Sequence, residues 1–147
     1  MVTLRTALFA DLDTWTLYAL LRLRVGVFVV EQECAYQELD GRDTEPTTEH
    51  LWLAAGDREP VAYLRILADP DGVARIGRVC VATTARGGGQ ARQLMDVALD
   101  RVGDRPCVLD AQTYLRGFYE RLGFAVTGPE FLDDGVPHVP MRRATAG

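Results

Sequence analysis

The sequence predicts an α/β (α+β) fold in which a mixed, twisted sheet of six or seven strands carries helices on both faces. Strand-like segments follow one another as a meander between Leu51 and Ala82, and the chain then alternates strand, helix, strand and helix. Strands in a meander pair antiparallel, whereas strands joined by a helix pair parallel, so one sheet that holds both kinds is mixed. A length of 147 residues suits one domain, which we expect to span residues 1–147.

The N-terminal third is expected to hold a strand, a helix and a long loop. Val2 to Phe9 has the pattern of a short strand, and Asp11 or Asp13 is placed to cap the helix that follows. The acidic segment "EQECAYQELDGRDTEPTTEH" then predicts a loop, and loops longer than about 12–15 residues are usually functional or disordered. The helix has an apolar side made of Leu17, Leu20, Leu21 and Phe28.

The meander is expected to contain the strands "HLWLAA", "PVAYLRILA" and "ARIGRVCVA". Gly56-Asp57 with Pro60 predicts a tight hairpin between the first two strands, and "DPDG" predicts the next turn. After three glycines, apolar residues recur at helical spacing over "QARQLMDVALDRV". "PCVLDA" predicts a buried strand, "YLRGFYERLGF" a helix that ends at Gly123, and "VPHVPMRR" a last strand whose prolines favour a sheet edge.

Composition excludes several classes of function. The formal net charge of −5 and the pI near 5.0 disfavour a nucleic-acid-binding surface. The apolar run "VGVFVV" is too short to cross a bilayer, and the first residues lack the pattern of a signal peptide, so we expect no membrane partner and a cytoplasmic protein. The three cysteines, Cys34, Cys80 and Cys107, form no CxxC or Cys/His cluster, so we expect neither disulfides nor a metal site.

Gly87, Gly88 and Gly89 lie between a predicted strand and a predicted helix. The first N–H groups of a helix lack intrahelical partners, and glycines let an anion such as a phosphate approach them. A P-loop is excluded because no Lys and Ser/Thr pair follows the last glycine. A Rossmann site fits less well, because its third glycine would be Arg92 and a meander precedes the only strand–helix–strand unit.

The segment "RGGGQA", Arg86 to Ala91, resembles the (Gln/Arg)-x-x-Gly-x-(Gly/Ala) signature of GNAT-type N-acetyltransferases. "AQTYLRGFYERLGF" is similar to the second motif of that superfamily, although Ala111-Gln112 stands where many relatives carry Asn. "LYALLRLRVGVFVVEQECAYQELDGRD", "IGRV" and "DDGVPHVPM" resemble the ElaA-like branch. The similarity covers nearly the whole chain.

This resemblance implies transfer of an acetyl group from acetyl-CoA to a primary amine by direct attack in a ternary complex. It also implies that the strands beside the pantetheine arm splay, and that a main-chain N–H near Cys80-Val81 polarises the thioester carbonyl. The implied cofactor-binding residues are Cys80, Val81, Arg86, Gly87, Gly88, Gly89, Gln90, Ala91 and Gln112.

Tyr119 occupies the position of the family's proton donor to the leaving thiolate, although its spacing with Leu115 and Leu122 also suits a core aromatic. Candidates for the base that deprotonates the amine are Glu31, whose apolar neighbours would raise its pKa, and His138 in the last strand. Tyr36 and Asp40 are further candidates in the same loop as Glu31, in which Arg65 could hold an acidic residue, whereas His50 suits the start of a strand.

The acceptor is expected to be an amine of a small molecule or a peptide, and the acidic loop favours a cationic one. Exposed edge strands would allow a homodimer. The alternative function is a non-catalytic acyl-CoA-binding regulatory module, because the glycines would bind acyl-CoA in either case.

Overall fold

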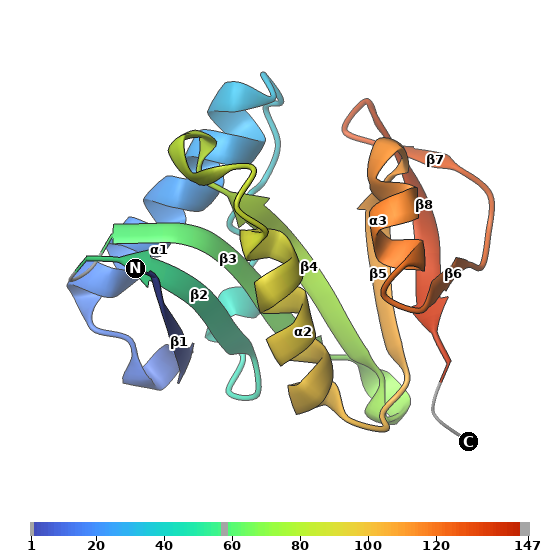
Figure 1. The fold of residues 1–147 in the computed structure, drawn as a ribbon, viewed down its shortest axis with the longest axis horizontal. Helices are drawn as coiled ribbons and strands as arrows, with labels where there is room; N and C mark the ends of the chain where they lie inside the picture. The colour runs from blue at the N-terminus through green and yellow to red at the C-terminus, as the bar shows by residue number, and fades with distance from the viewer. Residues whose placement is uncertain (1, 57–58, 145–147) are drawn as a thin grey trace.

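All the strands of the computed structural model belong to one twisted sheet, which Figure 1 shows (residues 2–56 and 59–144 are described). The sheet has eight strands in the order β1-β2-β3-β4-β5-β8-β6, and β7 pairs with β8. All neighbours are antiparallel except β4 and β5, which are parallel. The strands are β1 (Val2–Leu8), β2 (Glu49–Ala55), β3 (Glu59–Ala68), β4 (Ala74–Val81), β5 (Cys107–Gln112), β6 (Phe124–Val126), β7 (Phe131–Asp133) and β8 (Val136–Arg143).

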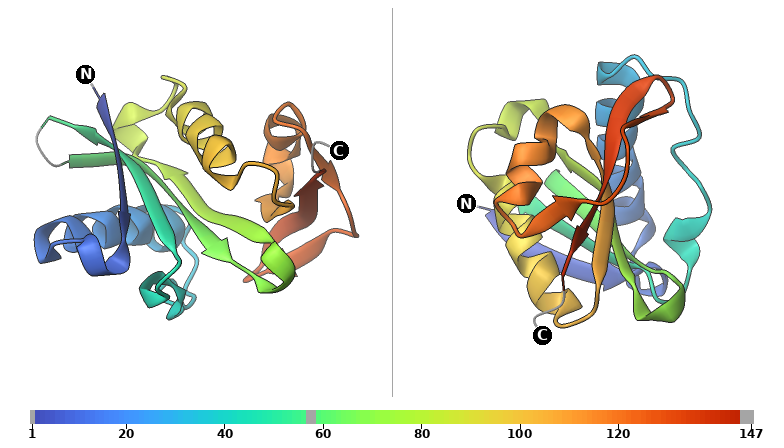
Figure 2. Two further views of the ribbon diagram at one scale, coloured as in Figure 1. Left: turned by 90° about the horizontal axis from the view of Figure 1, so that it is seen from below. Right: turned by 90° about the vertical axis from the view of Figure 1, so that its right-hand side faces the viewer.

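Three α-helices cover the sheet, and Figures 1 and 2 show them on both faces. α1 (Thr14–Val25) lies on one face and is capped by Asp13, whose Oδ1 accepts a hydrogen bond of 2.7 Å from Thr16 N–H. α2 (Gln90–Val102) and α3 (Arg116–Glu120) lie on the other face. α1 continues as a π-helical turn over Gly26–Glu31, a variation that is frequent at functional sites.

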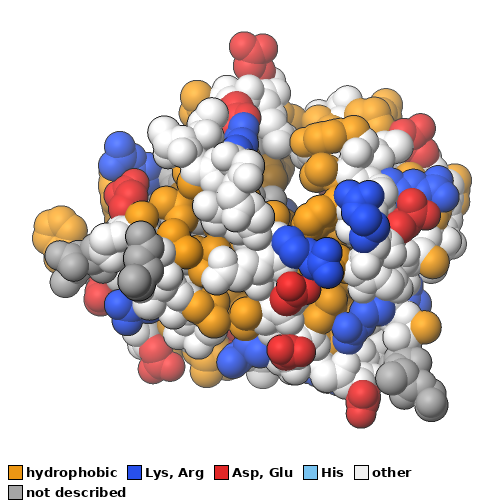
Figure 3. Space-filling model, viewed as in Figure 1, with side chains coloured by type: hydrophobic (Ala, Val, Ile, Leu, Met, Phe, Trp, Pro, Cys, Tyr) orange, Lys and Arg blue, Asp and Glu red, His pale blue; other side chains and the backbone are white. Residues whose placement is uncertain are grey.

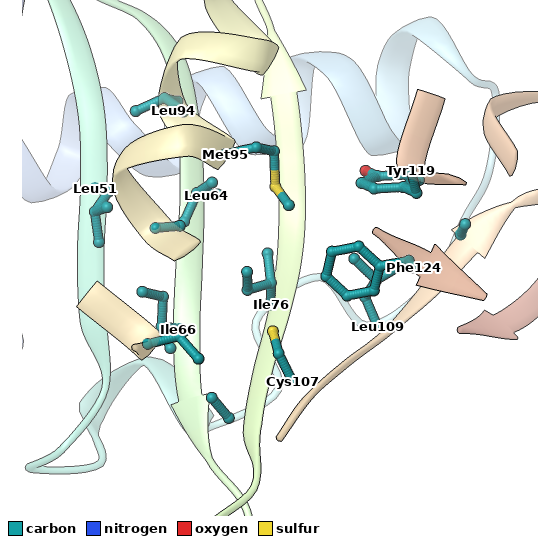
Figure 4. Packing of buried hydrophobic residues seen from close by; sticks show 14 of the residues in the cluster. Leu51, Leu64, Ile66, Ile76, Leu94, Met95, Cys107, Leu109, Tyr119 and Phe124 are labelled. Carbon is teal, nitrogen blue, oxygen red and sulfur yellow. The ribbon is translucent and has the colours of Figure 1, made fainter. Parts of the chain in front are cut away.

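The two faces bury separate hydrophobic clusters. The larger cluster joins α2 and α3 to β2, β3, β4, β5, β6 and β8, and Figure 4 shows Leu64, Ile76, Met95, Leu109 and Phe124 from it. The smaller cluster packs Leu20 and Val27 from the α1 side against Trp52, Tyr63 and Cys80. Alternating strand residues face opposite clusters, as the period of a strand requires.

The sheet divides between β4 and β5. Only Ala74 and Arg75 of β4 pair with Cys107 and Val108 of β5, although β4 continues to Val81. The two strands then diverge, and Figure 1 shows the widening space between them. The fold therefore opens toward the glycine loop.

These features confirm the predicted fold class, including helices on both faces and the splayed strands. The sheet has one strand more than the upper end of the expected range. The helix expected over "YLRGFYERLGF" is shorter than predicted, because a 3₁₀ turn over Thr113–Leu115 precedes it and the chain leaves it through Gly123, whose φ is +95°. The predicted tight turn between β2 and β3 includes residues 57 and 58, which lie outside the described residues, but the pairing of its strands is antiparallel as expected.

Candidate active site

A cavity of about 480 Å³ occupies the space between the diverging strands β4 and β5. Its walls come from β4, β5, α3, the π-helical turn and the hairpin formed by β7 and β8. Hydrophobic side chains are visible along this opening in Figure 3. Eight of the residues predicted for the site line the cavity: Glu31, Cys80, Val81, Arg86, Ala91, Gln112, Tyr119 and His138.

The glycine loop leads into α2 at one end of the cavity. Gly87 and Gly89 have φ values of +89° and +75°, a left-handed conformation that favours glycine. Gly89 is the N-cap of α2, and no side chain caps this helix end. A Cβ atom at Gly87 or Gly89 would meet no atom within 4 Å, so their surroundings are open. The loop therefore presents the first N–H groups of a 13-residue helix to an approaching anion.

A β-bulge interrupts β4 where it faces the cavity. Tyr63 of β3 pairs with Cys80, but Arg65 pairs with Gly77, so two β4 residues, Arg78 and Val79, lie opposite one residue of β3. In a bulge the extra residue is left out of the ladder. Arg78 has a φ of +56°, which is uncommon for a residue with a side chain. The bulge therefore leaves main-chain groups available beside the cavity, one or two residues before the predicted Cys80-Val81.

Tyr119 lies both in the hydrophobic cluster and on the cavity wall. Its ring is 6% exposed and packs edge-to-face against Phe118 and Phe124, with centroid distances of 5.0 and 6.2 Å. Its hydroxyl points from α3 toward β4 (Figure 4). Burial raises the pKa of Tyr119 well above its ordinary value, so the phenol stays protonated at neutral pH. The two interpretations of Tyr119, core aromatic and cavity residue, are therefore compatible.

His138 lies on β8 opposite Gln112 of β5, and its side chain lines the same cavity. Its Nδ1 lies 2.7 Å from the carbonyl oxygen of Val136. Because a carbonyl only accepts, Nδ1 carries the hydrogen and Nε2 is the basic nitrogen of the neutral ring. The ring stacks on Phe131, with a centroid distance of 5.9 Å.

Glu31 does not have the environment that the sequence predicted. Its carboxylate is exposed and accepts two hydrogen bonds from Arg86, of 2.6 and 2.7 Å. The hydrogen bond from Arg86 lowers the pKa of Glu31, opposite to the expected rise. Arg86 also donates to the carbonyl oxygen of Val81 at 3.1 Å. Of the apolar run before Glu31, Val27 is buried but Val30 is exposed, and Glu31 itself ends the turn at the cavity mouth, where an arginine distant in sequence reaches it.

Two further predicted residues have contacts of their own. Gln112 donates from its Nε2 to the side-chain oxygen of Gln32 at 3.2 Å, which joins the end of β5 to the end of the π-helical turn. Cys80 is 4% exposed, and burial raises the pKa of its thiol to about 12. The thiol of Cys80 is therefore protonated at neutral pH, so this residue contributes its main chain to the site rather than a reactive sulfur.

A network of buried ion pairs fixes the loop between residues 32 and 48. Arg24 is 1% exposed and donates to Glu38 and Asp43, at 2.7 Å each. Arg65 contacts Asp40 at 2.5 Å and Asp43 at 3.0 Å, as its proposed role in holding the loop required. Burial is the largest single influence on Asp40 and would raise its pKa, but the hydrogen bonds from Arg65 and from the main chain of Arg42, together with the charges of Arg65 and Arg78, hold that pKa well below its ordinary value.

His50 is a structural residue of β2. Its Nε2 donates to the main-chain oxygen of Asp43 at 3.1 Å, and its Nδ1 accepts from the hydroxyl of Tyr63 at 2.7 Å. Burial lowers the pKa of His50, so the ring is neutral at pH 7. The expectation that His50 belongs to the start of a strand is confirmed.

Sequence reasoning missed Arg24 and Arg78, which hold the acidic loop, and Cys34, whose thiol donates to the carbonyl oxygen of Asp134 at 3.3 Å. The only signal for the ion pairs in the sequence is the run of seven acidic residues from Glu31 to Glu49, for which arginines elsewhere in the chain are possible partners. The contact of Cys34 had no such signal, because it joins residues 100 positions apart.

In the part of the chain that the structure describes, no helix has the length and apolar character to cross a membrane. Within residues 2–56 and 59–144, no three His, Cys, Asp or Glu side chains group in a way that could hold a metal ion.

Comparison with known proteins agrees with this geometry. A family model for the acetyltransferase (GNAT) domain matches residues 24–145. A UPF0039 protein of Mycobacterium tuberculosis is 51% identical over 147 residues, which cover 98% of this chain and 94% of that protein. Protein ElaA of Escherichia coli is 41% identical over 140 residues, which cover 91% of each chain.

Two solved structures extend the similarity to three dimensions. A crystal structure of an acyl-CoA N-acyltransferase from Pseudomonas aeruginosa has a TM-score of 0.92 at 44% identity and covers 98% of this chain and 100% of its own. The crystal structure of Escherichia coli ElaA has a TM-score of 0.90 at 38% identity, with 97% and 99% coverage. The chain therefore belongs to the GNAT family of acyl-CoA N-acyltransferases, close to ElaA and the UPF0039 proteins.

Proposed function

We propose that this protein transfers an acetyl group from acetyl-CoA to the primary amine of a small molecule or peptide, by direct attack in a ternary complex. The observation that supports this most strongly is that Tyr119, His138, the β4 bulge and the start of α2 line one cavity. Groups for binding, polarisation and proton transfer meet where β4 and β5 diverge. A non-catalytic binding module would need only the groups that bind acyl-CoA.

The pyrophosphate of acetyl-CoA is proposed to bind at the glycine loop. The N-terminus of α2 has no side-chain cap, and the open space around Gly87 and Gly89 would admit a phosphate. Arg86 would add a charged hydrogen bond once it leaves Glu31. The pantetheine arm would then lie between β4 and β5, where Cys80 and Val81 line the cavity.

The acyl carbonyl is proposed to accept a hydrogen bond from the main chain of the β4 bulge. Negative charge develops on this oxygen as the amine nitrogen bonds to the acyl carbon, and a fixed N–H donor stabilises that charge. Such a donor typically contributes about 10²–10³ in kcat. A backbone group on a strand is well suited to this role because little reorganisation is needed during the reaction.

Proton transfers complete the proposed reaction. The amine must lose a proton to become nucleophilic, and the basic Nε2 of His138 is the candidate to accept it, directly or through water. The amine nitrogen forms the C–N bond and loses a second proton as it becomes an amide, the C–S bond breaks, and the hydroxyl of Tyr119 gives its proton to the thiolate. The proton released from the nitrogen restores the Tyr119 hydroxyl through solvent. Glu31 is not retained as the base, because its ion pair with Arg86 makes it a weaker base than an ordinary carboxylate.

The acidic loop no longer favours a cationic acceptor. Six of its carboxylates, Glu31, Glu38, Asp40, Asp43, Glu45 and Glu49, each pair with an arginine. The loop therefore presents little net negative charge to the cavity. The proposed acceptor is therefore an amine that need not carry several positive charges.

The test is thiol release from acetyl-CoA with a panel of polyamines, aminoglycosides, amino acids and peptides, together with mass-spectrometric detection of the N-acetylated product. We expect at least one amine to give turnover that depends on both substrates. Saturable acetyl-CoA binding without turnover on any amine class would instead support the binding module.

A further inference from the structure

Arg78 adopts a backbone conformation that its side chain disfavours. It lies within β4, yet its φ is +56°, in the left-handed region that glycine and asparagine tolerate best. A non-glycine residue in this region is strained and persists only when surrounding contacts hold it. Its neighbour Gly77 would adopt such a conformation at lower cost, so some contact of Arg78 must explain why the positive φ falls on the arginine.

The side chain of Arg78 provides that cause through Glu38. The guanidinium donates to the carboxylate of Glu38 at 3.1 Å and to its main-chain oxygen at 3.1 Å. It also lies over the ring of Tyr36, 5.6 Å from the centroid, and 3.5 Å from the carboxylate of Asp40. One arginine side chain therefore makes four contacts with a five-residue stretch of the loop.

Glu38 is itself a fixed anchor. Its side chain is 3% exposed, and the same carboxylate accepts a 2.7 Å hydrogen bond from Arg24 and another from the hydroxyl of Tyr36. Arg24 is in turn buried between Glu38 and Asp43. Charged groups that are buried and fully paired do not move independently, because each movement would leave a charge without a partner.

We propose that Arg78 is a positioning residue for the transfer step. Its hydrogen bonds to Glu38 hold the β4 bulge in the conformation that directs a main-chain N–H toward the acyl carbonyl. This inference rests on the proposed function, because it assigns the geometry of that site to one side chain. The side chain points into the loop, whereas the backbone of the same residue forms the bulge beside the cavity. The loop that borders the cavity and the proposed oxyanion donor are thereby one rigid unit.

The test compares Arg78→Asn with Arg78→Lys. Asparagine tolerates a positive φ but is too short to reach Glu38, so the substitution removes the hydrogen bonds to Glu38 without adding backbone strain. Lysine keeps the charge and the reach but not the forked geometry. Glu38 itself is a poor target, because removing it would leave Arg24 buried without this partner and would endanger folding. The matched control is Arg75→Asn, which removes an arginine of the same strand and cavity that pairs with Asp69 and Asp110.

We expect Arg78→Asn to lower kcat by about 10- to 100-fold, because small displacements of catalytic groups have costs of this size. KM for acetyl-CoA should change little, Arg78→Lys should recover part of the loss, and the control should keep most of its turnover. Peptides that contain Val79 to Val81 should also exchange amide hydrogens faster in Arg78→Asn than in the wild type, without any substrate.

The proposal is overturned if Arg78→Asn keeps the wild-type kcat and the wild-type exchange, or if it loses only melting temperature while kcat per folded molecule is unchanged. A wild-type protein that acetylates no amine would refute the proposed function instead. In that case the exchange measurement still decides whether Arg78 holds the bulge.

Discussion

Replacing Tyr119 with phenylalanine tests the proposed chemistry at one atom. The ring packs edge-to-face between Phe118 and Phe124, and phenylalanine keeps this packing. Among the hydrogen bonds of the described residues, none involves the hydroxyl of Tyr119, so its removal leaves no partner unsatisfied. The free energy of unfolding should therefore change by less than about 1 kcal/mol, since the substitution neither opens a cavity nor leaves a buried polar group without a partner.

Turnover should change much more than stability. Loss of a general acid typically costs 10²–10⁴-fold in rate. The loss should appear in kcat, whereas KM for acetyl-CoA should stay near its wild-type value, because the proposed binding site for acetyl-CoA is the glycine loop at the start of α2. Steady-state thiol release and thermal unfolding, measured side by side on wild type and Tyr119→Phe, give both quantities.

The matched control for Tyr119→Phe is Tyr114→Phe, which removes a hydroxyl from an exposed tyrosine of the same cavity wall. We expect this control to keep its turnover. Near-normal kcat in Tyr119→Phe would return Tyr119 to a purely structural role and leave solvent or His138 to protonate the thiolate. Equal losses in the two variants would show that the assay responds to the cavity surface rather than to proton donation.

Three further predictions follow from the same structure. Gly89→Glu should weaken CoA binding at least tenfold, about 1.4 kcal/mol, whereas Gly89→Asn, which tolerates the φ of +75°, should weaken it less; calorimetric titration with CoA measures both. Glu31→Gln removes the ion-pair partner of Arg86. If Arg86 binds the pyrophosphate as proposed, this change should tighten CoA binding by roughly two- to fivefold, a small effect because the ion pair is exposed; a large loss of kcat instead would restore Glu31 as the base. Burial would raise the pKa values of Asp40 and Asp43, but the hydrogen bonds and charges of the surrounding arginines together depress both. Their stabilisation is therefore present above pH about 4 and is lost as the pH falls toward the folded-state values; denaturant unfolding between pH 7 and pH 3 should show this loss, and a flat profile would contradict it.

Local patterns in the sequence were sufficient for the elements and the glycine loop. The cap at Asp13, the apolar spacing of α2 and the positive φ of Gly87 and Gly89 depend on residues a few positions apart. The order β1-β2-β3-β4-β5 then follows from the connections, because hairpins give antiparallel neighbours and a helical crossover gives a parallel one, whereas the place of β8 between β5 and β6 does not. Family resemblance added the splay of β4 and β5 and the position of Tyr119.

The β4 bulge could not be predicted in the same way. A bulge depends on which residue of β3 lies opposite Arg78, and that register is set by pairing across the sheet. Arginine at a positive φ is also the reverse of what propensity suggests, since neighbouring Gly77 has the greater freedom. Local rules give no sign of this conformation, because the side chain of Arg78 makes its contacts with Glu38, 40 residues away.

The acidic loop shows why charge in a sequence is a poor guide to the charge that a substrate meets. Between Glu31 and Glu49 the carboxylates are dense, and a cationic acceptor is the direct inference from them. In the folded chain arginines from α1, β3 and β4 reach into the loop, and a buried carboxylate held this way is a structural group rather than a recognition group. The burial argument for Glu31 failed for the same reason, because the nearest charge that acts on it, Arg86, is 55 residues away. Acceptor preference in this protein is therefore expected to depend on the shape of the cavity and on the few groups whose partners are not already within the fold, of which the basic nitrogen of His138 is the clearest.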